Sequence, residues 1–230
     1  MYTLHIANKN YSSWSLRPWV LMKEAGIPFE EKLHRFIPDT GGRGFTSFSP
    51  SGKVPTLIDG DNVVWDSLAI LEYLAERHQG VWPADPVARA WARSAASEMH
   101  SSFSALRNIC GMNVGVRVKL HEISPALHQD LVRMEELWAD GLARFGGPFL
   151  AGETFSAVDA FFCPVAFRVQ TYNLPMGEKA RAYAFRLLTL DSMLSWSKAA
   201  LREDFRDHPH DAELLEHGII TEDHRVPESA

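Results

Sequence analysis

The sequence predicts two successive domains, the first an α/β domain with the order β-α-β-β-α and the second an all-α helical bundle. Every strand-like alternation and the hairpin-type turn lie before residue 80, whereas helical periodicity prevails after residue 86. The intervening stretch, Val-Trp-Pro-Ala-Asp-Pro at residues 81–86, has the proline content that is typical of a linker. We therefore expect domains at residues 1–80 and 87–215 and a loose C-terminal tail at residues 216–230.

The beginning of the chain predicts a β-α-β unit. Residues 2–6 alternate between apolar and polar side chains, which is the pattern of a half-buried strand. Apolar residues recur at helical spacing over residues 16–25, and Gly26 is the residue type that commonly ends a helix. Residues 27–35 predict the second strand. Residues 36–52 are rich in glycine and proline and predict an irregular connection with at most one short helix.

Residues 53–58 and 63–65 predict an antiparallel hairpin, because these two β-rich runs flank the turn Asp59-Gly60. Pro55 opens the first of these strands, a position at which proline is tolerated. A cis peptide bond before Pro55 would be a deliberate feature of the fold.

The remaining elements are predicted to be helices. Asp66-Ser67 caps the helix that completes the first domain. In the second domain, Ser124-Pro125 supplies an N-cap followed by an N1 proline. Ser156 to Asp159 form a variant of the capping box, and Pro164 should kink the helix that follows. Apolar residues at a 3.6-residue period predict further helices over residues 88–106, 180–188 and 192–201.

Composition and charge exclude several classes of function. The net charge of -6 disfavours generic binding to nucleic acid or to an anionic membrane, both of which require a basic face. No apolar run approaches the ~20 residues of a membrane helix. No secretory signal is expected, because no basic segment followed by an apolar one opens the chain. Cys110 and Cys163 do not make a disulfide framework, so we expect two free thiols and a cytoplasmic protein.

Three serines gather where the first helix should begin. Ser12, Ser13 and Ser15 follow Tyr11 between the first strand and the first helix. The first N–H groups of a helix have no partner inside it and the macrodipole makes that end positive, so an anion is stabilised there. Hydroxyl donors at this point suit a thiolate, a carboxylate or a phosphate. The alternative is that the serines only cap the helix, since serine is a leading N-cap residue.

Together these features resemble the cytosolic glutathione transferases. Five segments are similar to motifs of that family and follow the same order: residues 12–17, 54–57, 66–74, 156–159 and 193–196. The first, Ser-Ser-Trp-Ser-Leu-Arg, resembles the S-S-C-S-W-R signature of the zeta class, which covers maleylacetoacetate isomerases. It departs from that signature at Trp14, where the zeta class has cysteine, and at Leu16, where it has tryptophan. The resemblance implies a thioredoxin-like first domain and glutathione as co-substrate.

The resemblance also implies which hydroxyl activates glutathione. The thiolate is the nucleophile, and a hydroxyl donor at a helix N-terminus favours it over the thiol. Ser12 holds the motif position of the catalytic hydroxyl, and Ser13 is the close alternative. Tyr11 is a third candidate, because some classes use a tyrosine near the end of the first strand.

Five further residues are implied to bind glutathione, and each has a purely structural alternative. The main chain of Val54, turned by a cis Pro55, would pair with the cysteinyl unit, whereas an ordinary trans proline would only open a strand. Ser67 would take the γ-glutamyl carboxylate and Asp66 would lie near its ammonium group, unless both only cap the helix. Lys53 could reach the glycyl carboxylate or remain solvated.

The electrophile is expected to bind between the domains, beside the first helix of the second domain. The candidate lining residues are Met99, His100, Phe103, Arg107 and Met112, although periodicity alone favours the core for most of them. Arg107 could bind an acidic substrate. His208 and His210 lie in a polar stretch without a further positioned ligand, so no metal is expected.

The leading hypothesis is a transferase that adds the glutathione thiolate to a hydrophobic electrophile. The alternatives are a zeta-like, glutathione-dependent cis–trans isomerase and a non-catalytic relative that binds another macromolecule. Retention of Ser12, Val54, Pro55 and Ser67 argues against the non-catalytic alternative. We also expect a homodimer, which the resemblance implies and which is the commonest oligomer.

Overall fold

The computed structural model describes residues 1–37, 40 and 43–228, and a mixed sheet forms the base of its first domain. Four strands lie in the order β2-β1-β3-β4. β1 pairs parallel with β2 and antiparallel with β3, and β3 pairs antiparallel with β4. The strands are β1 (Tyr2–Ala7), β2 (Phe29–His34), β3 (Thr56–Asp59) and β4 (Asn62–Trp65). The predicted β-α-β unit and the predicted hairpin are both confirmed.

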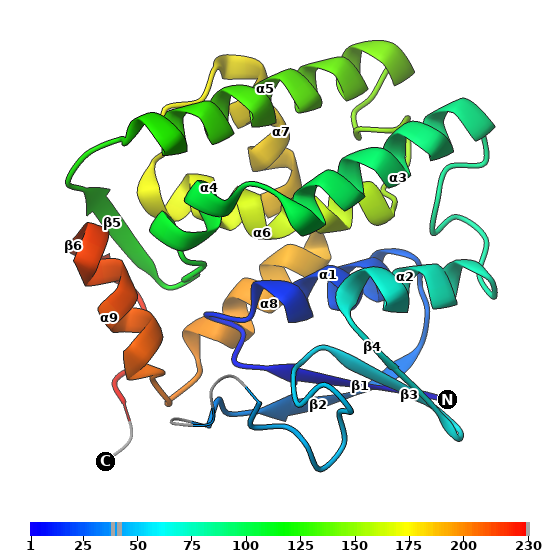
Figure 1. Cartoon of the computed structure of the whole chain (residues 1–230), viewed down its shortest axis with the longest axis horizontal. Helices are drawn as coiled ribbons and strands as arrows, with labels where there is room; N and C mark the ends of the chain where they lie inside the picture. The colour runs from blue at the N-terminus through cyan, green and yellow to red at the C-terminus, as the bar shows by residue number, and fades with distance from the viewer. Residues whose placement is uncertain (38–39, 41–42, 229–230) are drawn as a thin grey trace.

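Two helices cover one face of this sheet, α1 (Ser13–Glu24) and α2 (Ser67–Ala75) (Figure 1). The alternation in β1 places Leu4 and Ile6 in the core, where both are fully buried. In Figure 1 both helices lie between the sheet and the helical domain. α1 contacts β1 on one side and a helix of the second domain on the other, so nine of its residues are buried. Its N-terminus is consequently placed at the boundary between the domains.

The second domain is a helical bundle built around α6, which is buried along almost its whole length. Its helices are α3 (Pro86–Ser101), α4 (Ser104–Ile109), α5 (Pro125–Phe145), α6 (Ala157–Tyr172), α7 (Glu178–Leu188), α8 (Asp191–Leu201) and α9 (His208–His217). α6 packs against α1, α3 and α7. The fold is thus a thioredoxin-like domain followed by a helical domain, whereas the bounds 1–80 and 87–215 stay predictions.

The capping box of α6 is present, and its carboxylate also joins neighbouring segments. Asp159 accepts hydrogen bonds from the Ser156 N–H at 3.0 Å, the Leu150 N–H at 3.0 Å and the Tyr183 hydroxyl at 2.8 Å. Burial raises the pKa of Asp159 to about 6. Pro164 lies inside α6, which continues past it as one helix.

The structure differs from the sequence expectation at two places in the second domain. The apolar period over residues 88–106 crosses a break at Phe103, whose left-handed conformation (φ 57°) separates α3 from α4. The expectation of a loose tail at residues 216–230 is wrong for residues 218–223, which form β6 (Gly218–Asp223) and pair antiparallel with β5 (Val116–Leu120). This ribbon lies beside α9 in Figure 1. Residues 229 and 230 lie outside the described ranges.

The ribbon escapes sequence analysis because its strands are short, far apart in the chain and unequal in burial. Val116 and Val118 of β5 are buried, whereas β6 is mostly exposed and therefore polar. A polar strand that pairs across about a hundred residues has no local signature.

Within the described ranges, no helix combines the length and the apolar character that crossing a membrane requires. Cys110 and Cys163 are free thiols, as predicted, and both are buried. Burial raises the pKa of the Cys110 thiol to about 12 and raises that of Cys163 as well. Neither thiol therefore offers a reactive thiolate at neutral pH.

Candidate active site

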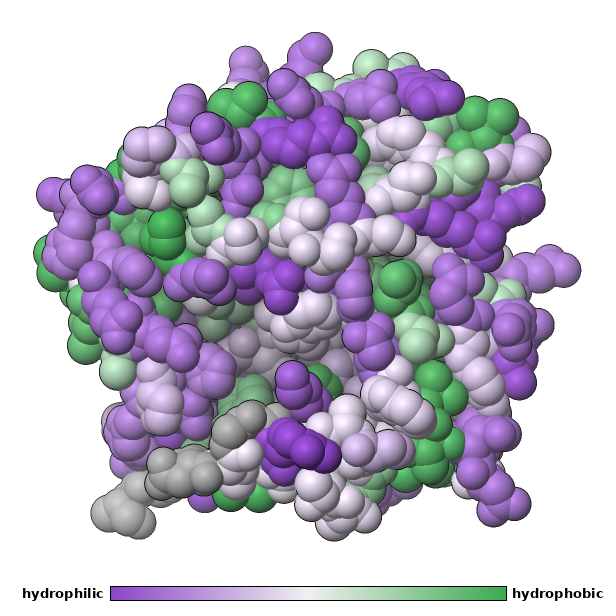
Figure 2. All heavy atoms as spheres, in the orientation of Figure 1, coloured by the Kyte–Doolittle hydropathy of each residue, from purple (hydrophilic) through white to green (hydrophobic). Residues whose placement is uncertain are grey.

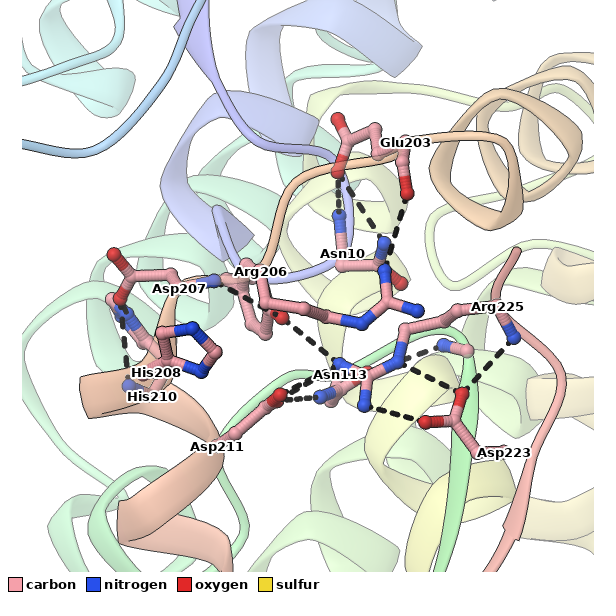
Figure 3. Close-up of polar contacts among 12 residues, drawn as sticks. Asn10, Asn113, Glu203, Arg206, Asp207, His208, His210, Asp211, Asp223 and Arg225 are labelled. Carbon is pink, nitrogen blue, oxygen red and sulfur yellow. Dashed lines mark hydrogen bonds and ion pairs between the residues drawn. The ribbon is translucent and has the colours of Figure 1, made fainter. Parts of the chain in front are cut away.

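The second domain fixes the loop between β1 and α1. Glu203, which follows α8, accepts hydrogen bonds from the Lys9 N–H at 2.6 Å and from the Asn10 side-chain amide at 3.3 Å. Asn10 and Glu203 face one another in Figure 3. Trp196 of α8 donates its ring N–H to the Lys9 carbonyl at 2.9 Å. The loop that leads to the serines is therefore anchored by the second domain.

Ser12 is the N-cap residue of α1 and Ser13 is its first residue, and both line a cavity at the domain boundary. The Ser12 hydroxyl donates to Ser15 Oγ at 2.7 Å and makes no cap hydrogen bond. The Ser13 hydroxyl has no hydrogen-bond partner among the described residues. The N–H of Trp14 likewise lacks a backbone partner in the described part of the chain. The positive end of α1 is therefore open, which makes capping alone an incomplete account of these serines.

The Val54-Pro55 peptide bond is cis, as the sequence predicts. The N–H and C=O groups of Val54 form no hydrogen bond with any described residue. Such unpaired main-chain groups are available to an extended peptide ligand. Lys53 precedes this edge, and its ammonium group forms no ion pair within the described ranges.

A second helix N-terminus, that of α2, faces the same region. Asp66 caps it by accepting from the Leu68 N–H at 2.8 Å and the Ala69 N–H at 3.3 Å. Ser67 is fully buried, and its hydroxyl accepts a hydrogen bond from Arg17 Nη1 at 3.3 Å. A helix N-terminus beside a guanidinium group favours the binding of a carboxylate.

Two adjoining cavities lie among these elements. The first, here called the interdomain cavity, has a volume of about 310 Å³, and its lining includes Ser12, Ser13, Met112 and Arg168. The second, here called the Ser67 cavity, has a volume of about 440 Å³, and its lining includes Pro55, Asp66 and Ser67. They share Trp14, Lys53, Val54 and Arg107. Figure 2 shows a hollow near the middle of this face, between the helical domain above and the sheet domain below.

The predicted electrophile-pocket residues separate into two groups. Arg107 and Met112 line the interdomain cavity. Met99 and Phe103 are core residues instead, with exposed fractions of 0% and 3%, and line neither cavity. Their assignment to the pocket is therefore corrected: Met99 belongs to the buried face of α3, and Phe103 is buried at the break between α3 and α4.

His100 lies close to the site without lining either cavity. Its ring contacts Trp14 edge-on, with 5.1 Å between ring centroids, and its Nε2 lies 3.5 Å from Asp66 Oδ2. Burial lowers the pKa of His100, an effect that Asp66 opposes and that the nearby Arg17 and Arg107 reinforce. His100 thus connects the α1 and α2 ends of the site.

Sequence reasoning missed two arginines at this site. Arg17 is buried with its guanidinium carbon 4.1 Å from the Trp14 ring centroid and 4.6 Å from that of Phe161. Arg168, from α6, lines the interdomain cavity and donates its Nε–H to the Cys110 carbonyl at 2.8 Å. The sequence contained one signal for Arg168, because this arginine is the single basic residue of α6. Arginines are rarely buried unless they are paired, so a lone arginine in a buried helix indicates a partner or a ligand.

Tyr11 also lines the interdomain cavity, but the C-terminal segment holds its hydroxyl. The hydroxyl accepts hydrogen bonds from Arg225 at 2.9 Å and from the Asp207 N–H at 3.4 Å. Arg225 lies between Asp211 and Asp223 and forms ion pairs with both, at 2.9 and 2.7 Å (Figure 3). The segment that follows α9 is therefore joined to the serine loop through Tyr11.

The two histidines of the polar stretch have structural partners. His210 Nδ1 pairs with Asp207, and its ring stacks on Tyr11. His208 lies 3.5 Å from Glu228 and is largely exposed. Over residues 1–37, 40 and 43–228, no group of three or more His, Cys, Asp or Glu side chains is arranged to hold a metal ion.

Comparison with known proteins places this site in a family. Residues 11–77 match the family model of the glutathione S-transferase N-terminal domain. A stringent starvation protein A homolog of Haemophilus ducreyi is 28% identical over 179 residues, covering 75% of this chain and 79% of that protein. A zeta-class glutathione S-transferase of Euphorbia esula is 29% identical over 175 residues, covering 72% and 76%.

A solved structure shares the fold over most of the chain. The glutathione transferase homolog from Burkholderia GL BGR1, with glutathione bound, aligns with a TM-score of 0.65 at 22% identity, covering 86% of this chain and 97% of that chain. The matched N-terminal segment contains the serine pair, the cis-proline edge and the capped start of α2. Residues 11–77 therefore form a glutathione S-transferase N-terminal domain, and the chain as a whole has the fold of the glutathione transferases.

Proposed function

We propose that the protein is a glutathione-dependent transferase that holds the glutathione thiolate at the N-terminus of α1 and directs it to an electrophile in the interdomain cavity. The observation that carries the proposal is the open helix end, where the unpaired Ser13 hydroxyl adjoins that cavity. A free thiol has a pKa of about 8.5, and hydrogen bonds and a helix dipole that favour the charged form lower it. The thiolate then forms a C–S bond while the leaving group departs with its electron pair.

In this proposal the tripeptide occupies the Ser67 cavity and extends toward the serines. The unpaired main chain of Val54 pairs with the cysteinyl unit. The N-terminus of α2 at Ser67, supported by Arg17, takes the γ-glutamyl carboxylate. Asp66 lies near the γ-glutamyl ammonium group, and Lys53 takes the glycyl carboxylate.

Single substitutions in the serine pair test the proposal. Ser13→Ala should lower kcat with a model aryl halide about 10- to 100-fold, the value of a hydrogen bond to a charged group. The KM for glutathione should change little, because the donor acts on the developing thiolate. Ser12→Ala should have a smaller effect, because its hydrogen is already donated to Ser15. Unchanged turnover in both variants would contradict the assignment of the thiolate site.

Binding to immobilised glutathione separates the transferase from a non-catalytic relative. The similarity to a stringent starvation protein A homolog, whose name is not that of a transferase, makes this second candidate worth testing. Retention with elution by free glutathione supports the transferase, and passage without retention contradicts it. The similarity to a zeta-class enzyme makes a glutathione-dependent isomerase the other alternative. A product of unchanged mass, formed only when glutathione is present, would favour the isomerase.

We also propose a homodimer. An exposed apolar face runs over β4 and α2, where Val63 is 38% and Trp65 is 46% exposed. Burying this face against a second copy would remove these side chains from water. Light scattering should give twice the monomer mass, and Trp65→Lys should shift the protein to the monomer. A monomer in the unsubstituted protein contradicts the proposal.

A further inference from the structure

The interdomain cavity carries positive charge that the described residues do not neutralise. Arg107 and Arg168 line it, and the buried Arg17 lies nearby. We propose that the electrophile is an organic acid whose carboxylate binds Arg168 and Arg107, an inference that rests on the proposed glutathione-dependent function. It replaces the hydrophobic electrophile that the sequence led us to expect.

Arg168 is a buried charge at the wall of this cavity. Its side chain is 5% exposed and lines the cavity from α6. Only its Nε–H has a partner among the described residues, the Cys110 carbonyl at 2.8 Å, which leaves the two terminal amino groups for a ligand. Burial lowers the pKa of Arg168 to about 10, so it remains charged at neutral pH. A buried and unpaired charge is costly, and a bound carboxylate would offset that cost.

Arg107 presents a second guanidinium group to the same space. It donates to the His100 carbonyl at 3.2 Å, and its guanidinium carbon lies 4.8 Å from the Trp14 ring centroid. Burial lowers the pKa of Arg17 most, the charges of Arg168 and Arg107 lower it further, and Asp66 opposes them by less. The charge of Arg107 also lowers the pKa of Arg168, after the larger effect of burial. The three guanidinium groups therefore repel one another, and an anion between them would relieve that repulsion.

Acidic side chains do not supply this anion within the described ranges, since no ion pair there includes Arg17, Arg107 or Arg168. Among the described lining residues of the interdomain cavity, Glu213 of α9 is the acidic one, and it forms no ion pair with these arginines. Aromatic and apolar side chains complete the lining, among them Phe36, Phe45 and Met112. The cavity thus fits a small molecule with one carboxylate and a short apolar body.

The glycyl carboxylate of glutathione is a second possible source of the anion, because Arg107 lines both cavities. Two conjugates of matched length distinguish the sources. S-(3-carboxypropyl)glutathione and S-butylglutathione have the same tripeptide and differ at the end of the S-substituent. Titration calorimetry of the full chain measures both affinities.

The unsubstituted protein should bind the carboxylated conjugate at least about 10-fold more tightly than the butyl conjugate. Arg168→Met and Arg107→Met should each remove most of that preference and leave the butyl affinity within about 3-fold. Arg168→Lys should retain part of the preference, because the charge remains without the fork geometry. Arg181→Met, at an exposed position of α7, is the matched control and should change neither affinity.

The same data contain the results that would overturn the inference. Equal affinities in the unsubstituted protein would show that the cavity does not select a carboxylate. An equal loss of affinity for both conjugates in Arg168→Met would assign the arginine to glutathione itself. If neither conjugate nor glutathione binds, the proposed function fails and this inference fails with it.

Discussion

Removal of the Arg225 side chain should destabilise the second domain by about 3 kcal/mol, because a mostly buried carboxylate then loses its cation. Arg225 is 4% exposed and bonds to both oxygens of Asp211 at 2.9 Å. It also pairs with Asp223 and donates to the Tyr11 hydroxyl at 2.9 Å.

The magnitude follows from the burial of each partner. Breaking a buried ion pair by removing one partner costs about 3–5 kcal/mol. Asp211 is 17% exposed and keeps a hydrogen bond from Asn113 at 2.9 Å, so the lower end of that range applies. Asp223 is 42% exposed, so its pair with Arg225 adds less than about 1 kcal/mol.

Urea unfolding of Arg225→Ala should therefore show a loss of about 3 kcal/mol, and amide hydrogens of β5 and β6 should exchange faster. Arg181→Ala, which removes an exposed arginine, is the control and should change stability by less than about 0.5 kcal/mol. Gly115→Ala tests the same contacts independently and should also lower the free energy of unfolding, because a Cβ at that position would lie 2.2 Å from Arg225 Cγ. A loss below about 1 kcal/mol in Arg225→Ala would refute the reasoning that the C-terminal segment is an integral part of the fold.

Three further predictions concern the site and the core. Tyr11→Phe should lower the free energy of unfolding by about 1 kcal/mol and leave turnover within about 3-fold, because its hydroxyl accepts from the C-terminal segment; a larger loss of turnover would assign the sulfur donor to Tyr11. His5 Nδ1 lies 2.9 Å from His34 Nε2, and burial lowers the pKa of both rings, with His34 also lowering that of His5. The unfolded chain thus binds protons more tightly than the folded protein, so the free energy of unfolding should fall as pH falls through about 6.5. The difference between urea midpoints measured above and below that pH should be smaller in His5→Gln than in the unsubstituted protein. Asp159→Ala leaves four buried hydrogen bonds unmade and should cost about 3 kcal/mol, measured by urea unfolding, whereas a loss below about 1 kcal/mol would contradict its role as a joint between segments.

Most elements of the fold could be predicted because their signals are local. The Asp59-Gly60 turn sets the hairpin, Asp66 caps α2, and Asp159 completes the capping box of α6. Each of these features depends on residues only a few positions apart. A sequence reader can therefore recognise them without knowing the tertiary structure.

The elements that escaped prediction depend on distant partners. β6 is stable because it pairs with β5 about a hundred residues earlier, and because Arg225 behind it reaches Tyr11 in the first domain. The backbone turns at Phe103, between α3 and α4, although the apolar period continues through it, because periodicity describes which face is buried and not where the backbone turns.

The candidate site divides in the same way. The sequence by itself determined the local structure of Ser12-Ser13, Val54-Pro55 and Asp66-Ser67, the segments that we propose to bind glutathione, because a turn, a proline and a helix cap are encoded in adjacent residues. Only the tertiary structure decided the charge of the neighbouring cavity. Arg107 and Arg168 belong to separate helices, and whether each guanidinium faces solvent, an acidic partner or a shared cavity depends on how those helices pack.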